Sequence, residues 1–277
     1  MTEMTYTAIH LTGTYNRYVD PLDSHKELFT LYQGFTKEDG SRHYPSTALL
    51  CGFPKSTPQM PTLPKHDEVW NILHELGHGI HDLVAKTTYS RFHGTASPVD
   101  FAEAPSQMLE FWCWSPSQLK ALSCHYSALS PEYFQTWSNE SQVEGKENLA
   151  PAVQLPDEMI ASLMRSKYAN GSLFHLRQLH LGTVDMAVHS PETPAEIEKL
   201  NISAYWNALR KEMLKMDGLE VLELDQGHEW GHGQANFGHM VTDYDAGYYS
   251  YLLSVLLPLR NPKHFGFVVR NRFWVLT

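Results

Sequence analysis

The chain has 277 residues, enough to bury a sizeable core as one domain or two. Its hydrophobic share of 42% excludes a disordered protein. The net charge of -10 argues against nucleic acid or an anionic membrane as a main partner. Three cysteines, Cys51, Cys113 and Cys124, are too few for a disulfide framework and suit a reducing compartment.

We expect no secretory signal peptide and no membrane span. No basic and apolar leader with a small-residue cleavage site opens the chain. The longest apolar candidate for a membrane span, residues 251–257, is far too short. We therefore expect a cytoplasmic protein without a membrane partner.

Residues 1–65 are the least helical part of the sequence. Residues 6–11 and 46–53 are predicted to form short strands, with a turn at Asp39-Gly40 between them. A proline-rich stretch over residues 54–64 then leads into the first helix.

The next segment carries the most informative motif. Over residues 66–86 the apolar residues recur at steps of three and four, which predicts an amphipathic helix. His74 and His78 lie one turn apart on it, where both imidazoles can bind one metal ion. Glu75 is expected to face a water beside the metal rather than the metal itself.

Beyond a loop over residues 87–99, helices are predicted almost throughout, several of them opened by proline. The predicted helices cover residues 100–114, 116–129, 131–137, 156–169, 172–188, 191–200, 203–216 and 241–257. A glycine-rich loop over residues 227–238 precedes the last helix. The expected fold class is therefore mostly α (α+β), with a small N-terminal β element and a helical bundle.

A third metal ligand is expected from the second helix, at Glu103. Two histidines and a carboxylate leave the fourth position of a zinc ion open, as a catalytic site requires. His81 falls on the same helical face as His74 and His78. It could be a third ligand, a residue behind the ligands or facing substrate, or a partly buried histidine.

A second histidine-glutamate-x-x-histidine motif spans residues 228–232. Glycines in and around it disfavour the helix that a metal site of this type needs. A loop whose backbone approaches a substrate is the better interpretation.

These motifs together resemble the thimet oligopeptidase, neurolysin and saccharolysin family of zinc peptidases. The sequence looks closest to those of the family's fungal members. The matching runs are His66-Asp67-Glu68-Val69, His74-Glu75-Leu76-Gly77-His78, Phe92-His93-Gly94-Thr95 and Asp100-Phe101-Ala102-Glu103-Ala104-Pro105-Ser106-Gln107-Met108-Leu109-Glu110. The resemblance implies a zincin-like catalytic domain with one Zn²⁺ per chain on His74, His78 and Glu103. It also implies that Glu75 is the catalytic general base.

A later block is similar to the family's substrate-binding segment. It comprises Phe237-Gly238-His239 and Tyr244-Asp245-Ala246-Gly247-Tyr248-Tyr249-Ser250-Tyr251. The resemblance implies substrate contacts from His239, Tyr244, Tyr248 and Tyr251, with His239, Tyr248 and Tyr251 also catalytic. On a helix the three tyrosines would share one face. An aromatic stripe of this kind otherwise indicates core packing.

The resemblance covers about residues 30–251 and lacks the family's preceding helical half. We expect a catalytic domain over residues 1–257 and a divergent tail over residues 258–277. The leading hypothesis is a zinc-dependent endopeptidase that hydrolyses internal bonds of short peptides. We expect this protein to have no nucleic-acid partner and no obligate protein partner. The alternatives are a truncated, inactive zinc-binding remnant and a structural zinc protein, which would have no use for Glu75.

Overall fold

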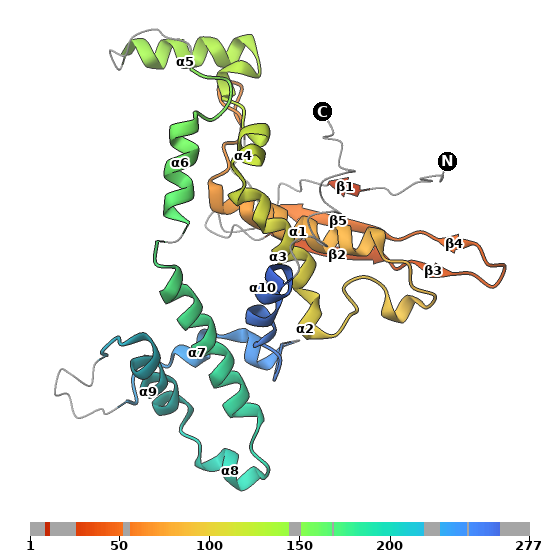
Figure 1. The fold of residues 1–277 in the computed structure, drawn as a ribbon, viewed down its shortest axis with the longest axis vertical. Coiled ribbons are helices and arrows are strands. Elements are labelled where there is room, and N and C mark those ends of the chain that lie inside the picture. The colour runs from red at the N-terminus through yellow and green to blue at the C-terminus, as the bar shows by residue number, and fades with distance from the viewer. Residues whose placement is uncertain are drawn as a thin grey trace. The chain divides into compact units, whose positions relative to one another are not determined.

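The computed structural model describes residues 9–11, 26–51, 56–143, 151–167, 169–218, 228–242 and 244–260 (Figure 1). Most described residues are helical and the strands are few and short, so the mostly α (α+β) prediction is confirmed. The fold divides into two units. The first comprises Met1–Ser97 and Pro105–Lys167, and the second Pro98–Ala104 and Tyr168–Thr277.

A three-stranded sheet lies in the first unit. Its order is β1 (Ile9–Leu11), β5 (Ser46–Cys51), β2 (Lys26–Tyr32), with β5 parallel to β1 and antiparallel to β2. In β5 the buried residues Thr47 and Leu49 alternate with half-buried ones, as expected for a strand with one face against a core. The sequence predicted β1 and β5 but not β2.

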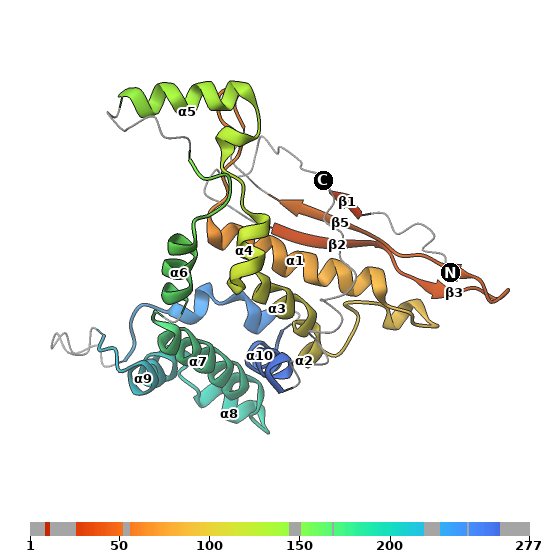
Figure 2. The ribbon, with the colours of Figure 1, turned by 45° about the horizontal axis from the view of Figure 1, so that its top comes forward.

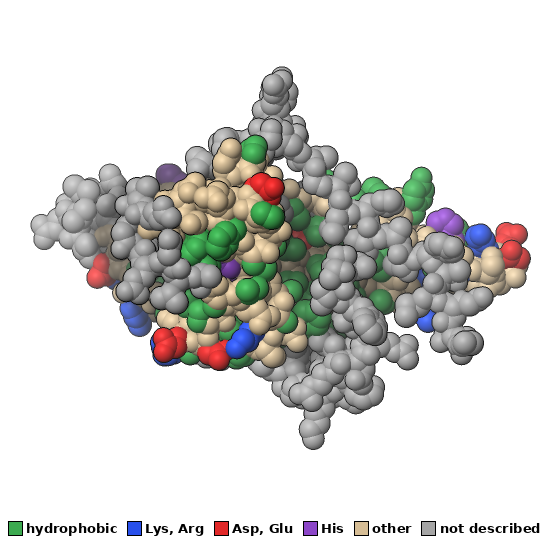
Figure 3. Space-filling view, turned by 90° about the horizontal axis from the view of Figure 1, so that it is seen from above, with side chains coloured by type: hydrophobic (Ala, Val, Ile, Leu, Met, Phe, Trp, Pro, Cys, Tyr) green, Lys and Arg blue, Asp and Glu red, His purple; other side chains and the backbone are tan. Residues whose placement is uncertain are grey.

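The predicted turn at Asp39-Gly40 is confirmed. It joins β3 (Phe35–Thr36) to β4 (Arg42–His43) in a separate hairpin. The Asp39 carboxylate accepts the N–H of Ser41 at 2.8 Å, and Gly40 has φ +79°. Figure 3 shows acidic and basic side chains side by side at the end of this hairpin, as suits a solvated turn.

Helix α1 (His66–Val84) is the predicted amphipathic helix, and it lies along β2 and β5 (Figure 1). Its start is stabilised by Glu68, whose carboxylate accepts the N–H of Lys65 at 2.6 Å. It ends where Ala85 turns to an extended backbone (φ −59°, ψ 131°). The helix therefore offers one face to the sheet and the other to the helices that follow.

A single helix over residues 100–114 was predicted, and this prediction is wrong. The segment forms α2 (Val99–Ala102), α3 (Ala104–Glu110) and a 3₁₀ turn over Phe111–Trp114. Pro105 has no N–H to donate to the carbonyl of Phe101, so the helix breaks between them.

Apolar residues of α1, α3 and the 3₁₀ turn form the core of the first unit. The buried members are Leu73, Leu109 and Cys113, and the half-buried ones are Val69, Trp70, Leu76, Ile80, Trp112 and Trp114. Burial raises the pKa of the Cys113 thiol to about 11. All three cysteines are free, as expected.

The described part of the first unit also contains α4 (Pro116–Leu122), α5 (Pro131–Val143) and α6 (Asp157–Ser166). The helix predicted to reach residue 129 stops at Leu122. Ser123 is extended there, and its hydroxyl accepts the N–H of Leu155 at 2.9 Å. A tertiary contact thus overrides local propensity.

The second unit is built on a helix pair, α7 (Gly171–His189) and α9 (Ile202–Leu214), joined through α8 (Pro194–Lys199) (Figure 2). The ring of His180 bonds through Nε2 to the carbonyl of Trp206 at 3.0 Å across this pair. The buried core residues are Leu181, Val184, Trp206, Met240 and Tyr248.

The last predicted helix, residues 241–257, is wrong at its start. The chain forms a 3₁₀ turn over Gly238–Val241 and turns over residues 244–249, and α10 runs over Ser250–Arg260. Ala246 adopts a left-handed backbone (φ +53°), which ends any helix there. The predicted tail of residues 258–277 lies outside the described residues beyond Arg260.

None of the helices among the described residues combines the length and the apolar character that a membrane crossing requires.

Candidate metal centre

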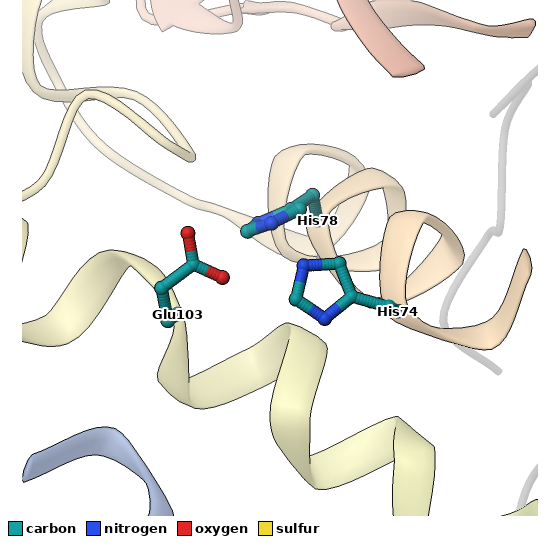
Figure 4. Close-up of side chains that lie close together, drawn as sticks. All are labelled: His74, His78 and Glu103. Carbon is teal, nitrogen blue, oxygen red and sulfur yellow. The ribbon is translucent and has the colours of Figure 1, made fainter. Parts of the chain in front are cut away.

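The structure brings His74, His78 and Glu103 together. One ligand atom from each of the three side chains lies within 4.8 Å of the others (Figure 4). The two imidazoles come from successive turns of α1, with ring centroids 5.0 Å apart and planes at 85°. Glu103 ends α2 and is 2% exposed, with its carboxylate turned toward the imidazoles (Figure 4).

A glycine on α1 sets how closely the next helix approaches. A Cβ on Gly77 would stand 2.5 Å from the Cα of Ser106 and 2.7 Å from the carbonyl oxygen of Pro105. Only a residue without a side chain permits this backbone contact. Glu103 lies two residues before Pro105 in the chain, close to this contact in sequence.

The orientation of His74 is fixed by a second carboxylate. Its Nδ1 lies 2.6 Å from Oε1 of Glu110 on α3, and both side chains are about one-fifth exposed (21% and 18%). With Nδ1 engaged, Nε2 is the nitrogen that faces a metal, as in many carboxylate–histidine–metal arrangements. Glu110 was not among the residues predicted for the site. Its position two turns after Glu103 was the available signal.

The donor set fits a zinc ion. Two imidazole nitrogens and one carboxylate are a ligand set of catalytic zinc sites, whereas calcium and magnesium prefer oxygen ligands throughout. A buried carboxylate such as Glu103 is costly unless it is paired or coordinates a metal. Glu75 follows His74 on α1 and is half-buried.

His81 does not belong to the group of converging donor atoms found among the described residues. It lies half-buried on α1, and burial lowers its pKa, opposed by the charge of Asp82. This position fits the interpretation of a partly buried histidine, and a role behind the ligands or facing substrate stays a prediction.

The second motif, His228 to His232, is not helical. Gly231 and His232 both have positive φ (+70° and +40°). Nδ1 of His232 bonds to the Ser203 hydroxyl at 2.8 Å, and Asn207 donates to the carbonyls of His228 and Trp230 at 2.6 Å. The motif therefore packs on α9, and a substrate contact from it stays a prediction.

The four residues expected to contact substrate form one aromatic cluster in the second unit. The ring of His239 lies 5.6 Å from Tyr244, 5.4 Å from Tyr248 and 6.0 Å from Tyr251, between centroids. Tyr251 in turn lies 5.1 Å from Tyr244 and 4.9 Å from Tyr248. The expectation of a shared helical face is wrong, because only Tyr251 lies on a helix; turns bring the other rings to it.

The tyrosine hydroxyls differ in their surroundings. Tyr244 donates to Oε1 of Glu103, and Tyr248 donates to Oε1 of Gln178 at 2.8 Å. Burial, and then the negative charge of Glu103, raises the pKa of Tyr251 well above its ordinary value. A phenol in this environment stays protonated and remains a hydrogen-bond donor.

A buried carboxylate holds the loop between α1 and α2. Asp82 is 0% exposed, and its carboxylate accepts the N–H of Thr95 at 3.0 Å and the hydroxyl of Thr30. Gly94 has φ +55°, and a Cβ there would lie 1.8 Å from Oδ1 of Asp82. This corner ties the loop that leads to Glu103 to the last turn of the histidine helix.

Comparison with known proteins agrees with these features. The model of Peptidase family M3 matches residues 14–261. The chain is 41% identical over 230 residues to saccharolysin of Saccharomyces cerevisiae, covering 82% of this chain and 28% of that protein. It is 37% identical over 226 residues to oligopeptidase PhomG of Diaporthe leptostromiformis, covering 81% of this chain and 31% of the relative.

The similarity extends to bacterial proteins. Oligopeptidase A of Escherichia coli is 30% identical over 233 residues, which cover 80% of this chain and 28% of that enzyme. The chain thus spans less than a third of the length of each of these relatives.

Proposed function

Because the chain belongs to peptidase family M3, we propose that it is a zinc endopeptidase that hydrolyses internal bonds of short peptides. The observation that carries the proposal is the convergence of His74, His78 and Glu103 within 4.8 Å. The hydrogen bond that the Glu110 carboxylate accepts from Nδ1 of His74 supports it, because such a bond prepares an imidazole to bind a metal.

The three ligands would hold one zinc ion and leave one coordination position open. When bound, zinc supplies a Lewis acid that polarises a carbonyl and brings the pKa of a coordinated water toward about 7. Glu75, beside the first ligand on α1, would accept the proton of the attacking water at its carboxylate. It would then pass that proton to the leaving amine.

The aromatic cluster would stabilise negative charge on the substrate oxygen. Tyr251 is the proposed donor, because its ring lies against those of His239 and Tyr244, and Tyr244 in turn donates to the proposed ligand Glu103. The hydroxyl of Tyr248 is already engaged with Gln178. Tyr244, which donates to Glu103, would hold that ligand, and His239 would contact the substrate among the three rings.

The proposed partners are short peptides alone. A net charge of -10 is unfavourable for nucleic acid or an anionic membrane. The names of the relatives, saccharolysin, oligopeptidase PhomG and oligopeptidase A, support an oligopeptide substrate.

The experiment compares the parent chain with Glu75→Gln and with Asp67→Asn, an exposed control in the first turn of α1. Bound zinc is measured, and a quenched fluorescent peptide is assayed with and without a chelator. We expect about one zinc per chain and chelator-sensitive cleavage by the parent and Asp67→Asn. Glu75→Gln should retain zinc and lose about 100-fold or more in kcat.

Two results would contradict the proposal. Cleavage by Glu75→Gln at the parental rate would remove the assigned base. Zinc binding without chelator-sensitive cleavage would favour the alternative of an inactive zinc-binding remnant.

A further inference from the structure

A buried carboxylate on α7 binds the backbone of the tyrosine segment, residues 244–251. Asp185 is 0% exposed. Its Oδ1 accepts the N–H of Ala246 and its Oδ2 accepts the N–H of Tyr248, both at 3.1 Å. One side chain thus binds two backbone amides of a turn that are two residues apart.

Neither of these two amides has an acceptor within the turn among the described residues. Within the segment, the N–H of Gly247 donates to the carbonyl of Tyr244, and that of Ser250 to Gly247. Ala246 has φ +53°, so it needs an outside contact to hold its unfavourable backbone. Asp185 supplies that contact.

Other residues on the same face of α7 also bind the segment. Gln178, Gly182 and Asp185 stand at positions i, i+4 and i+7, which share one helical face. Gln178 accepts the Tyr248 hydroxyl at 2.8 Å. A Cβ on Gly182 would lie 3.6 Å from the Cα of Tyr249, so the segment's backbone passes over this position.

We propose that Asp185 is a positioning residue for the substrate-facing tyrosines. By fixing the backbone at Ala246 and Tyr248, it sets the rings of Tyr244 and Tyr251, which flank these amides in the chain and lie 5.1 Å apart. The inference rests on the proposed function, since it assigns Asp185 to the geometry of that same site. Asp185 itself contacts backbone and His189, whose Nδ1 lies 3.0 Å from Oδ1.

The test uses the zinc-loaded full chain, its variant Asp185→Asn and the control Thr183→Val, which lies two residues away on α7. Thr183 donates only to the carbonyl of Leu179 in its own helix. Asparagine keeps one acceptor and places an NH₂ group against the other amide. Hydrogen exchange of the peptide covering residues 244–251, followed by mass spectrometry, should quicken about tenfold in Asp185→Asn and remain parental in Thr183→Val.

Kinetics then separate positioning from a general structural role. We expect Asp185→Asn to lower kcat about tenfold with little change in KM, because the tyrosines act in the transition state. If Asp185 acts through Tyr251, the double variant Asp185→Asn/Tyr251→Phe should be no slower than Tyr251→Phe alone. Zinc content should equal that of the parent.

The exchange measurement does not need an active enzyme, so the two proposals fail separately. If the parent cleaves no peptide, the proposed function is wrong and exchange alone decides the positioning role. A hydrogen-exchange rate in Asp185→Asn equal to that of the parent would overturn that role. So would a loss of kcat in the double variant equal to the product of the two single losses. Should Asp185→Asn not fold, the parent still decides: amides in residues 244–251 exchanging as fast as an unfolded peptide would also overturn it.

Discussion

The Cα of Ser106 on α3 lies so close to Gly77 on α1 that a methyl group on Gly77 would stand 2.5 Å from it. Gly77 is also one residue before His78, a proposed metal ligand. The packing of α1 on α3 and the position of this proposed ligand therefore meet at neighbouring residues of one helix.

Gly77→Ala should destabilise the protein, although alanine favours a helix more than glycine by about 1 kcal/mol. The obstacle is backbone, which cannot rotate away, so we expect a net loss of about 1–3 kcal/mol in the free energy of unfolding. Urea denaturation measures it. The control is Gly79→Ala, where the nearest atom is Cδ1 of Leu28 at 3.0 Å, the end of a flexible side chain. That change should lie within about 0.5 kcal/mol of the parent, and equal losses in both variants would contradict the prediction.

Glu110→Gln should weaken metal binding without removing a ligand. The amide keeps an acceptor near Nδ1 of His74 but loses the charge that raises the basicity of the ring. We expect zinc affinity to fall about 10- to 100-fold in a chelator competition assay. Glu132→Gln, an exposed change in the first turn of α5, is the matched control and should bind zinc as the parent does. An unchanged affinity in Glu110→Gln would show that this bond does not tune the site.

Tyr248 and Tyr251 should respond differently to loss of the hydroxyl. Tyr251→Phe should lower kcat about 100-fold with KM nearly unchanged, the result expected when an oxyanion donor is removed. Tyr248→Phe should lower kcat less and cost about 0.5–1.5 kcal/mol of stability, because its hydroxyl binds Gln178. Steady-state kinetics of both variants measure the loss of kcat, and thermal unfolding measures the loss of stability. The reverse order of kcat losses would transfer the donor role to Tyr248.

His180 should make the protein less stable in acid. Burial lowers its pKa, so below pH of about 6.5 the unfolded chain binds a proton that the folded chain does not. The free energy of unfolding should therefore fall as the pH falls from about 6.5. His180→Gln retains an N–H donor for the Trp206 carbonyl and should flatten this dependence by up to about 1.4 kcal/mol per pH unit.

Urea denaturation between pH 7.5 and 5 tests this, with exposed His175→Gln as the control. Burial also lowers the pKa of His81 and of His93, so part of the acid slope should remain in His180→Gln. If both variants keep the full parental slope, His180 is not a source of acid sensitivity.

The sequence predicted α1 closely because its signals are local. Apolar spacing and acid in the first turn identify residues 66–86, and the helix runs over His66–Val84. Strand β2 was missed because its pairing with β5, 14 or more residues away along the chain, is not a local property. The break at Glu103 follows from Pro105 and could have been predicted.

The predictions for the site also differ in whether their signals are local in the sequence. The spacing of His74, His78 and Glu103 was readable from the sequence, and the structure brings these side chains together. The spacing of the tyrosines at 244, 248 and 251 also fits a helix, but Asp185 and the left-handed Ala246 hold a turn instead. Contacts from α7, distant in sequence, decided that outcome.

The corner at Gly94 has a consequence for sequence change. Because Asp82 binds the backbone of Thr95, the path from there to Glu103 begins at a fixed point on α1. Insertions in the exposed stretch around Tyr89, upstream of that anchor, would leave the anchor in place. The same insertion between Thr95 and Glu103 would displace the carboxylate itself, so loop grafting in this protein should be confined to the first of these two stretches.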